Sequence, residues 1–162
     1  KFPSQEYFIG NLMDYYIQKG KIDEGLAQMD AVLAKNSTPY FLYVKGVLQY
    51  EKKDYDGAIA TFNQIIAEGK DFVAEAYSKI GDCSFFPAQE IVEENSKLSM
   101  DDPKYAANEA KIKELYEKAL PFYEKAKEVK PDNRQLWGQY LLNIYWKLDK
   151  EKYNALEKEL GY

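Results

Sequence analysis

The chain has 162 residues, of which 46% are hydrophobic and 30% charged, and its formal net charge is −5. This composition is typical of a folded protein, and the acidic balance argues against nucleic acid as a partner, because phosphate groups attract basic surfaces. The longest apolar runs span only a few residues, so we expect no insertion into a membrane.

The residue types that most catalytic and metal sites need are scarce. The sequence contains no histidine, and Cys83 and Arg134 are its only cysteine and arginine. Without histidine, Ser-His-Asp and Cys-His catalytic sites and most zinc sites are excluded. The acidic runs at residues 90–94 and 101–102 lack the ligand spacing of a calcium loop. We therefore expect a protein that is not an enzyme, with no cofactor and no metal.

The first two predicted hairpins span about residues 6–38 and 39–71. In each of them apolar residues recur at the i, i+3/i+4, i+7 spacing of an amphipathic helix, first before and then after a short polar break. Gly20 lies in the first break, where the end of a helix favours a left-handed residue. Each hairpin has apolar residues on more than one face, so we expect it to need neighbours of the same kind.

The two hairpins repeat with a common register. Overlaying Gly25 on Ala58 and Met29 on Phe62 gives a period of 33 residues, a length typical of helical solenoids. The pattern resembles the tetratricopeptide repeat, whose unit of about 34 residues places small and large apolar residues at fixed positions. In the second hairpin the matching positions are Leu42, Gly46, Ala58 and Phe62.

The third predicted hairpin, about residues 74–131, is longer than the others. Its repeat positions match at both ends, and an insertion of about residues 87–113 separates them. The simplest interpretation is a hairpin with two lengthened arms joined near Ser99–Pro103. Pro87 and Pro121 lie where each arm leaves the regular repeat, and we expect kinks or short breaks there because proline removes a helical hydrogen bond.

The fourth predicted hairpin, about residues 134–160, ends in a helix with one apolar stripe among charged residues. Such a helix would close a helical stack against water. The chain begins at Lys1 without a comparable polar cap, and we expect repeats upstream in a longer parent. The predicted fold is an all-α superhelix of about four helical hairpins, the third with lengthened arms, forming a single domain over residues 1–162.

The resemblance implies a concave groove lined by the first helix of each hairpin. Carried over position by position, its partner-binding side chains are mainly aromatic, a residue type that dominates binding hot spots. The alternative, that several of the aromatic side chains pack in the core instead, stays open at this point. The predicted groove residues are Tyr7, Asp14, Tyr40, Tyr43, Val47, Tyr50, Lys79, Phe85, Tyr145 and Trp146.

Some family members bind the carboxylate tails of heat-shock chaperones through a clamp of basic and amide side chains. Here the corresponding positions include two acids and only one lysine, so we expect no such clamp; they are Gly10, Asp14, Val44, Glu75 and Lys79. The leading hypothesis is a non-catalytic scaffold that binds a peptide or protein segment. The alternatives are a sensor of a small ligand, such as a peptide fragment or sugar, and an architectural segment of a longer solenoid.

The basic residues are almost all lysine, which is typical of AT-rich genomes, and the chain has a general likeness to tetratricopeptide proteins of the Bacteroides group. These features favour a bacterial origin. They leave the location open between the cytoplasm and the periplasm or cell envelope, and they do not indicate an oligomeric state.

Overall fold

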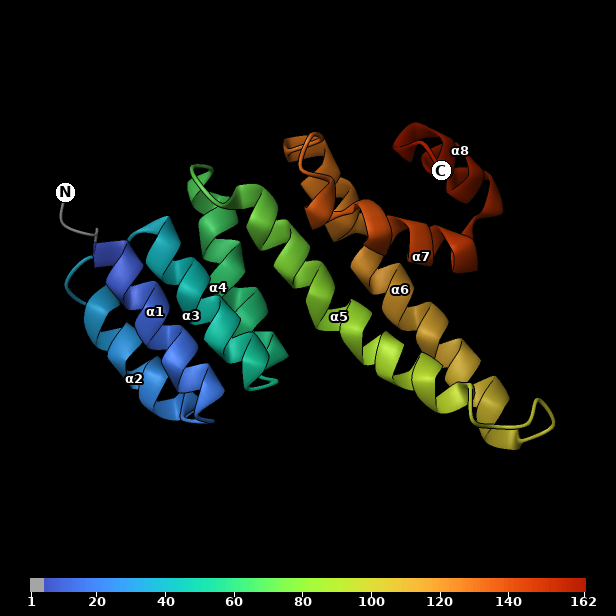
Figure 1. The fold of residues 1–162 in the computed structure, drawn as a ribbon, viewed down its shortest axis with the longest axis horizontal. Coiled ribbons are helices and arrows are strands. Elements are labelled where there is room, and N and C mark those ends of the chain that lie inside the picture. Colours follow the sequence, from blue (N-terminus) through green and yellow to red (C-terminus); the bar gives the residue numbers. More distant parts are fainter. Residues whose placement is uncertain (1–4) are drawn as a thin grey trace. The chain divides into compact units, whose positions relative to one another are not determined.

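The structure is a computed structural model that describes residues 5–162, and over that range its regular elements are helices (Figure 1). They follow one another along the chain as α1 Gln5–Gln18, α2 Ile22–Leu33, α3 Pro39–Glu51, α4 Tyr55–Glu68, α5 Val73–Asn95, α6 Pro103–Val129, the short 3-10 helix η1 Arg134–Leu136, α7 Gly138–Leu148 and α8 Lys150–Leu160. The pairs of consecutive helices confirm the predicted all-α fold of about four hairpins, which is consistent with a tetratricopeptide-like solenoid.

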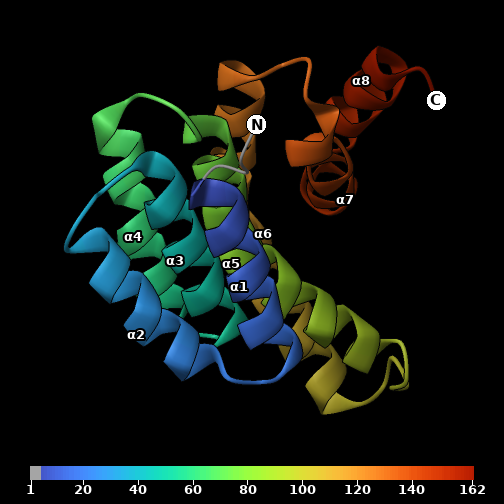
Figure 2. The same cartoon turned by 60° about the vertical axis from the view of Figure 1, so that its left-hand side comes forward.

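The chain forms two compact units that meet in sequence between Lys79 and Ile80, inside α5. In the first unit α1 packs on α2 and α3, α2 packs on α3, and α3 packs on α4. Both views show these four helices lying side by side (Figures 1 and 2). Buried apolar side chains from the first three helices form a common core; they are Met13, Met29, Phe41, Val44 and Leu48.

Short-range signals set the ends of the helices in the first unit. The Thr38 hydroxyl accepts a hydrogen bond from the Phe41 amide at 3.2 Å and caps the start of α3. The Asp54 carboxylate caps α4 in the same way through the Gly57 amide, at 3.1 Å. Gly69 ends α4 in the left-handed conformation, with φ of 63°, which glycine adopts without the steric cost of a Cβ atom.

The small and large residues of the repeat pattern meet face to face. A Cβ atom added at Gly46 in α3 would lie 2.5 Å from the ring of Phe62 in α4, and one added at Gly81 in α5 would lie 2.8 Å from the ring of Tyr123 in α6. Both rings are fully buried. The glycines therefore let the two helices of each hairpin approach closely enough for the large side chain to fill the gap.

The third hairpin is lengthened as expected. Its helices α5 and α6 have 23 and 27 residues, while the other α-helices of the described chain have 11 to 14. Both run without interruption through Pro87 and Pro121, so short breaks are absent there, and a kink at either proline stays a prediction. A proline removes a single backbone donor. Buried side chains anchor the helix on both sides of that loss, Phe85 and Ala88 around Pro87 and Ala119 and Tyr123 around Pro121.

The fourth hairpin packs α7 against α6 and α8. In α8 the predicted apolar stripe is present, because Leu156 is buried and Tyr153 and Leu160 are partly buried, while the lysines and all glutamates except the partly buried Glu157 are exposed. Asp149 caps this helix by accepting hydrogen bonds from the amides of Glu151 and Lys152 at 3.1 and 3.0 Å.

Candidate functional site

The first unit contains a hollow of about 220 Å³ between α1 and α3. Four of the predicted groove residues line it, namely Asp14 from α1 and Tyr40, Tyr43 and Val47 from α3. The helix register therefore brings these side chains together as the repeat pattern suggested. The complete lining of this first-unit hollow is Gly10, Met13, Asp14, Ile17, Tyr40, Tyr43, Val44, Val47 and Leu48.

Tyr40 ties the two walls of the hollow together. Its hydroxyl donates a hydrogen bond to the Glu6 carbonyl oxygen at 3.0 Å, which fixes the start of α3 against the start of α1. Gly10 leaves the room for this phenol, since a Cβ atom there would lie 2.7 Å from the Tyr40 oxygen. Burial, helped by the negative charges of Glu6 and Asp14, raises the pKa of Tyr40, so the hydroxyl keeps its proton farther into the alkaline range than an ordinary tyrosine does.

Tyr43, one helical turn after Tyr40 in α3, also lines the hollow, and its ring packs against aromatic neighbours. Its ring stacks on Phe72, with centroids 5.4 Å apart and planes inclined by 27°, and contacts Phe62 at 5.9 Å. Phe72 precedes α5 and has φ of 66°, an unusual backbone conformation for a bulky residue. The half-buried Tyr43 thus presents a fixed edge to the hollow instead of a freely rotating side chain.

Asp14 is the one charged residue in the lining of the first-unit hollow. Its side chain is exposed, whereas the apolar side chains around it, such as Val44 and Leu48, are buried. The hollow therefore combines an apolar floor with a negative charge at its rim. This arrangement can hold an apolar side chain with a neighbouring basic group.

The remaining predicted groove residues of the first unit lie outside the hollow. Tyr7 is 59% exposed and its ring contacts Phe8 edge to face at 6.0 Å. Tyr50 is half-buried, and its ring lies against Tyr55 at 5.7 Å. The Lys79 ammonium lies 5.4 Å from the centroid of the Tyr50 ring, within the range of a cation–π interaction.

In the second unit the predicted groove residue Phe85 lies in the core. It is 3% exposed and contacts three tyrosine rings, from Tyr116, Tyr123 and Tyr140, at centroid distances of 5.6, 5.9 and 5.2 Å. Tyr123 and Tyr140 stack almost parallel at 4.6 Å. We call these four residues the aromatic cluster. A partner could reach Phe85 only after this cluster rearranged.

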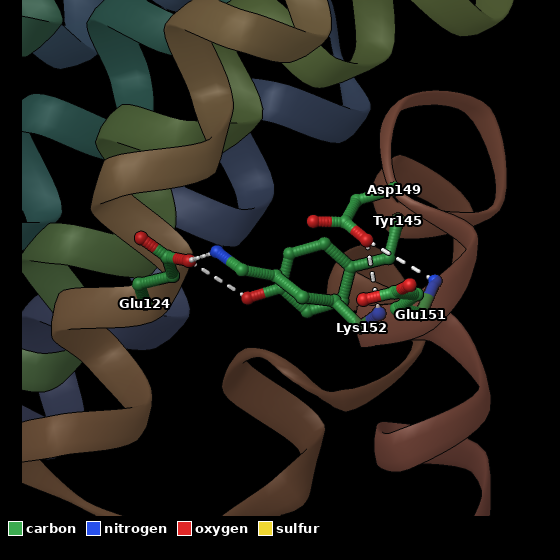
Figure 3. A network of polar contacts seen from close by, with 5 residues as sticks. All are labelled: Glu124, Tyr145, Asp149, Glu151 and Lys152. Carbon is green, nitrogen blue, oxygen red and sulfur yellow. Dashed lines mark hydrogen bonds and ion pairs between the residues drawn. The ribbon is translucent and has the colours of Figure 1, made fainter.

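Tyr145 is also buried, with 8% of its surface exposed. Its hydroxyl donates to the Glu124 carboxylate of α6 at 2.7 Å, and the Lys152 ammonium of α8 contacts the same oxygen at 3.2 Å (Figure 3). Burial and the negative charge of Glu124 raise the pKa of Tyr145. This network joins three helices, so it supplies a structural role for Tyr145.

Trp146, the next residue, faces outward and is 62% exposed. The Lys150 ammonium lies 3.6 Å from its ring centroid, and Tyr153 contacts it edge to face at 5.2 Å. Trp146 lines a second hollow, formed by the lengthened hairpin and α7.

Sequence reasoning overlooked three contributors to the first-unit hollow. The buried side chains of Met13 and Leu48 belong to its lining. Phe72, which follows the second hairpin in sequence, stacks on the ring of Tyr43. The apolar spacing marks Met13 and Leu48 only as buried residues, and a single aromatic residue after a turn gives no sign of where its ring will pack. Three-dimensional packing was needed to find them.

Across residues 5–162 there is no cluster of three or more histidine, cysteine, aspartate or glutamate side chains arranged to hold a metal ion. In the same range, none of the helices combines the length and apolar character needed to cross a membrane.

Comparison with known proteins places the best-defined similarity in the first unit. Residues 11–71 match the family model of the tetratricopeptide repeat, which is less than half of the chain. No curated protein matches the chain. Repeats of this family generally mediate protein–protein interactions and are typically non-catalytic. The matched residues include most of the first-unit hollow, and the match supports assignment to a tetratricopeptide repeat family.

Proposed function

We propose that the chain is a non-catalytic interaction module that binds a peptide segment of another protein in the first-unit hollow. The observation that carries this proposal is the joining of Asp14, Tyr40, Tyr43 and Val47 around one hollow, within the residues that match the tetratricopeptide repeat. Aromatic side chains held in fixed positions lose little entropy when a partner binds.

The size of the hollow favours a peptide side chain over a whole small molecule. Its volume of about 220 Å³ equals the share of about seven water molecules. Pockets for drug-sized ligands usually measure roughly 300–1,000 Å³. The hollow therefore suits an apolar anchor residue of a peptide whose remaining length lies along α1 and α3.

The charge of the rim refines the peptide chemistry. Asp14 is exposed at the edge of an otherwise uncharged lining, and a lysine, an arginine or a peptide amino group next to the anchor residue would complement it. We therefore propose an apolar residue adjacent to a basic group as the recognised element. The bacterial origin and the likeness to the Bacteroides group stay predictions from the sequence.

The test uses a random peptide library displayed on phage and the full chain as bait. We expect enrichment of peptides with an apolar residue beside a basic one, and calorimetry should then give dissociation constants for the selected peptides. Val47→Lys should abolish binding, because it places an ammonium group inside the apolar lining. Asp14→Lys should weaken binding at least several-fold, because it replaces attraction by repulsion.

The matched control is Asp71→Lys, which makes the same charge change at an exposed residue in the turn after α4, outside the hollow. This variant should bind the selected peptides as the unmodified chain does. An equal loss of peptide affinity in Asp71→Lys and Asp14→Lys would contradict the proposed contact between the peptide and Asp14. Full binding by Val47→Lys would contradict the proposed site.

A further inference from the structure

The lengthened third hairpin creates a second hollow, of about 520 Å³, that the regular repeat does not contain. It lies between the far ends of α5 and α6 and the side of α7, and it belongs entirely to the second unit. We call it the second-unit hollow. Its volume falls in the range typical of small-molecule sites, and it is more than twice as large as the first-unit hollow.

One side of the second-unit hollow is apolar. It includes Val92 from α5, Met100 from the turn between the arms, Ile112 from α6 and Trp146 from α7. Met100 is 82% exposed and Trp146 62% exposed, so a ligand would remove large apolar surfaces from water. Burial of such surface is the main favourable term in binding an organic molecule.

The other side carries a polar atom that lacks a partner. Asn95 lines the hollow and is 5% exposed, and its side-chain nitrogen donates to the Tyr105 carbonyl oxygen at 3.3 Å and to Glu109 Oε1 at 3.2 Å. These two acceptors fix the orientation of the amide, because a flipped amide would direct its oxygen toward them. The oxygen Oδ1 is left buried with no donor. Such an acceptor is unfavourable unless a donor reaches it.

The neighbouring side chains do not supply that donor. The Asn108 side-chain nitrogen, which belongs to α6 but not to the lining of the hollow, is also buried without an acceptor and forms no hydrogen bond with Asn95. The Lys147 ammonium is engaged with the Glu109 carboxylate in an ion pair. This pair is the only charged one in the lining and leaves it without net charge, so a charged ligand would have to compete with an existing partner.

We propose that the second-unit hollow binds a neutral small molecule with an apolar body and one N–H or O–H donor, which hydrogen-bonds Oδ1 of Asn95. The apolar body lies against Val92, Met100, Ile112 and Trp146, and the Glu109–Lys147 pair excludes charged analogues. This site is independent of the peptide site in the first-unit hollow.

A suitable probe is N-phenyl-1-naphthylamine, a neutral aromatic amine with one N–H donor whose fluorescence rises in apolar surroundings. The full chain is titrated with the probe, and energy transfer from tryptophan is recorded together with the probe emission. We expect saturable binding at one site with quenching of Trp146. The ether analogue 1-phenoxynaphthalene, which lacks the donor, should displace the probe roughly five-fold less effectively than the amine itself.

Two matched variants locate the site. Val92→Lys places a charge in the apolar wall at a residue that is already 38% exposed, so the fold should tolerate it. It should lower the affinity for the probe at least ten-fold. Val129→Lys makes the same change at a residue that is 49% exposed and lies outside the hollow. It should bind the probe as the unmodified chain does.

Asn95→Leu tests the hydrogen bond, and in this variant the amine and the ether should bind equally well. If it fails to fold, the comparison of amine and ether on the unmodified chain decides the same point. Equal affinity for the two compounds on the unmodified chain would overturn the assigned role of Asn95. Absence of saturable binding, or unchanged binding by Val92→Lys, would overturn the site itself.

Discussion

The two units place the same repeat element in different surroundings. In the first unit Gly46 faces the ring of Phe62, and in the second unit Gly81 faces the ring of Tyr123. Beyond this shared contact, Tyr40 and Tyr43 of α3 in the first unit line an open hollow. In the second unit the rings of the aromatic cluster pack on one another around Phe85.

The difference shows that an aromatic residue on the first helix of a repeat does not by itself make a binding surface. Tyr50 and Phe85 hold corresponding positions, four residues after Gly46 and Gly81. Tyr50 is half-buried, whereas Phe85 is 3% exposed. The lengthened α6 provides Tyr116, which stacks on Phe85 at 5.6 Å. In the second unit, therefore, the space around Phe85 is filled by aromatic rings, and the hollow of this unit lies farther along the lengthened helices α5 and α6.

The largest expected effect comes from truncating the two corresponding aromatic residues. Phe85→Ala should lower the free energy of unfolding by about 3–5 kcal/mol, because it leaves a cavity among packed rings. Tyr50→Ala should cost distinctly less, since its side chain is already half-exposed to water. Urea titration followed by circular dichroism measures both values. Equal losses of stability would show that the surroundings of Phe85 and Tyr50 do not differ in packing as proposed.

Adding one methyl group at the close contact tests what the units share. Gly46→Ala and Gly81→Ala should each lower the free energy of unfolding by about 1–3 kcal/mol, although alanine favours helix, because the new atom overlaps a buried ring. Gly138→Ala is the control, since a Cβ atom there would lie 3.6 Å from Arg134 Cβ, an ordinary van der Waals contact. The account is wrong on this point if all three variants are equally stable.

The polar contact inside the second unit should have a smaller effect. The Tyr123 hydroxyl donates to the buried Asp82 carboxylate at 2.7 Å, while Phe62, at the corresponding place in the first unit, has no hydroxyl. Tyr123→Phe should lower the free energy of unfolding by about 1–3 kcal/mol, because a buried acceptor loses a donor. Tyr162→Phe, at an 80% exposed residue, should leave the stability unchanged. A free energy of unfolding that is unchanged in Tyr123→Phe would argue against a stabilising role of this hydrogen bond.

The smallest effect is a dependence of stability on alkaline pH that the second unit should show through Tyr145. Because the folded state raises the pKa of Tyr145, the neutral hydroxyl stabilises the fold below the ordinary tyrosine pKa of about 10. That contribution is lost as the pH rises from there toward the folded value. The difference in stability between the unmodified chain and Tyr145→Phe should therefore shrink between pH 9 and pH 11, as measured by urea titration.

Lysine side chains also titrate in this range, so only the difference between the two proteins carries the test. A difference that stays constant with pH would show that folding does not raise the pKa of Tyr145.

The sequence predicted the fold because its determinants are local and periodic. The spacing of Leu42, Gly46, Ala58 and Phe62 is sufficient to indicate a hairpin and its repeat. The long third hairpin followed from the distance between its matching ends. The helix breaks at Pro87 and Pro121 were wrongly expected, because local rules for proline omit the packing around it.

The candidate sites were only partly predictable. The resemblance to the tetratricopeptide repeat, carried over position by position, assigned Asp14, Tyr40, Tyr43 and Val47 to one groove, and all four line the first-unit hollow. It could not show that Phe85 and Tyr145 are buried, since their neighbours Tyr116 and Glu124 come from α6, whose register follows a long insertion. The buried oxygen of Asn95 likewise depends on contacts that no sequence pattern encodes.

The central claim is that the first unit offers an open peptide site where the second unit is filled. The most direct measurement is a nuclear magnetic resonance titration of the isotope-labelled full chain with a peptide selected from the random library. We predict that the amide signals of Gly10, Asp14 and Val47 shift progressively and saturate, while those of Phe85 and Tyr123 stay in place. Shifts confined to the aromatic cluster, with unchanged signals around the first-unit hollow, would contradict the account.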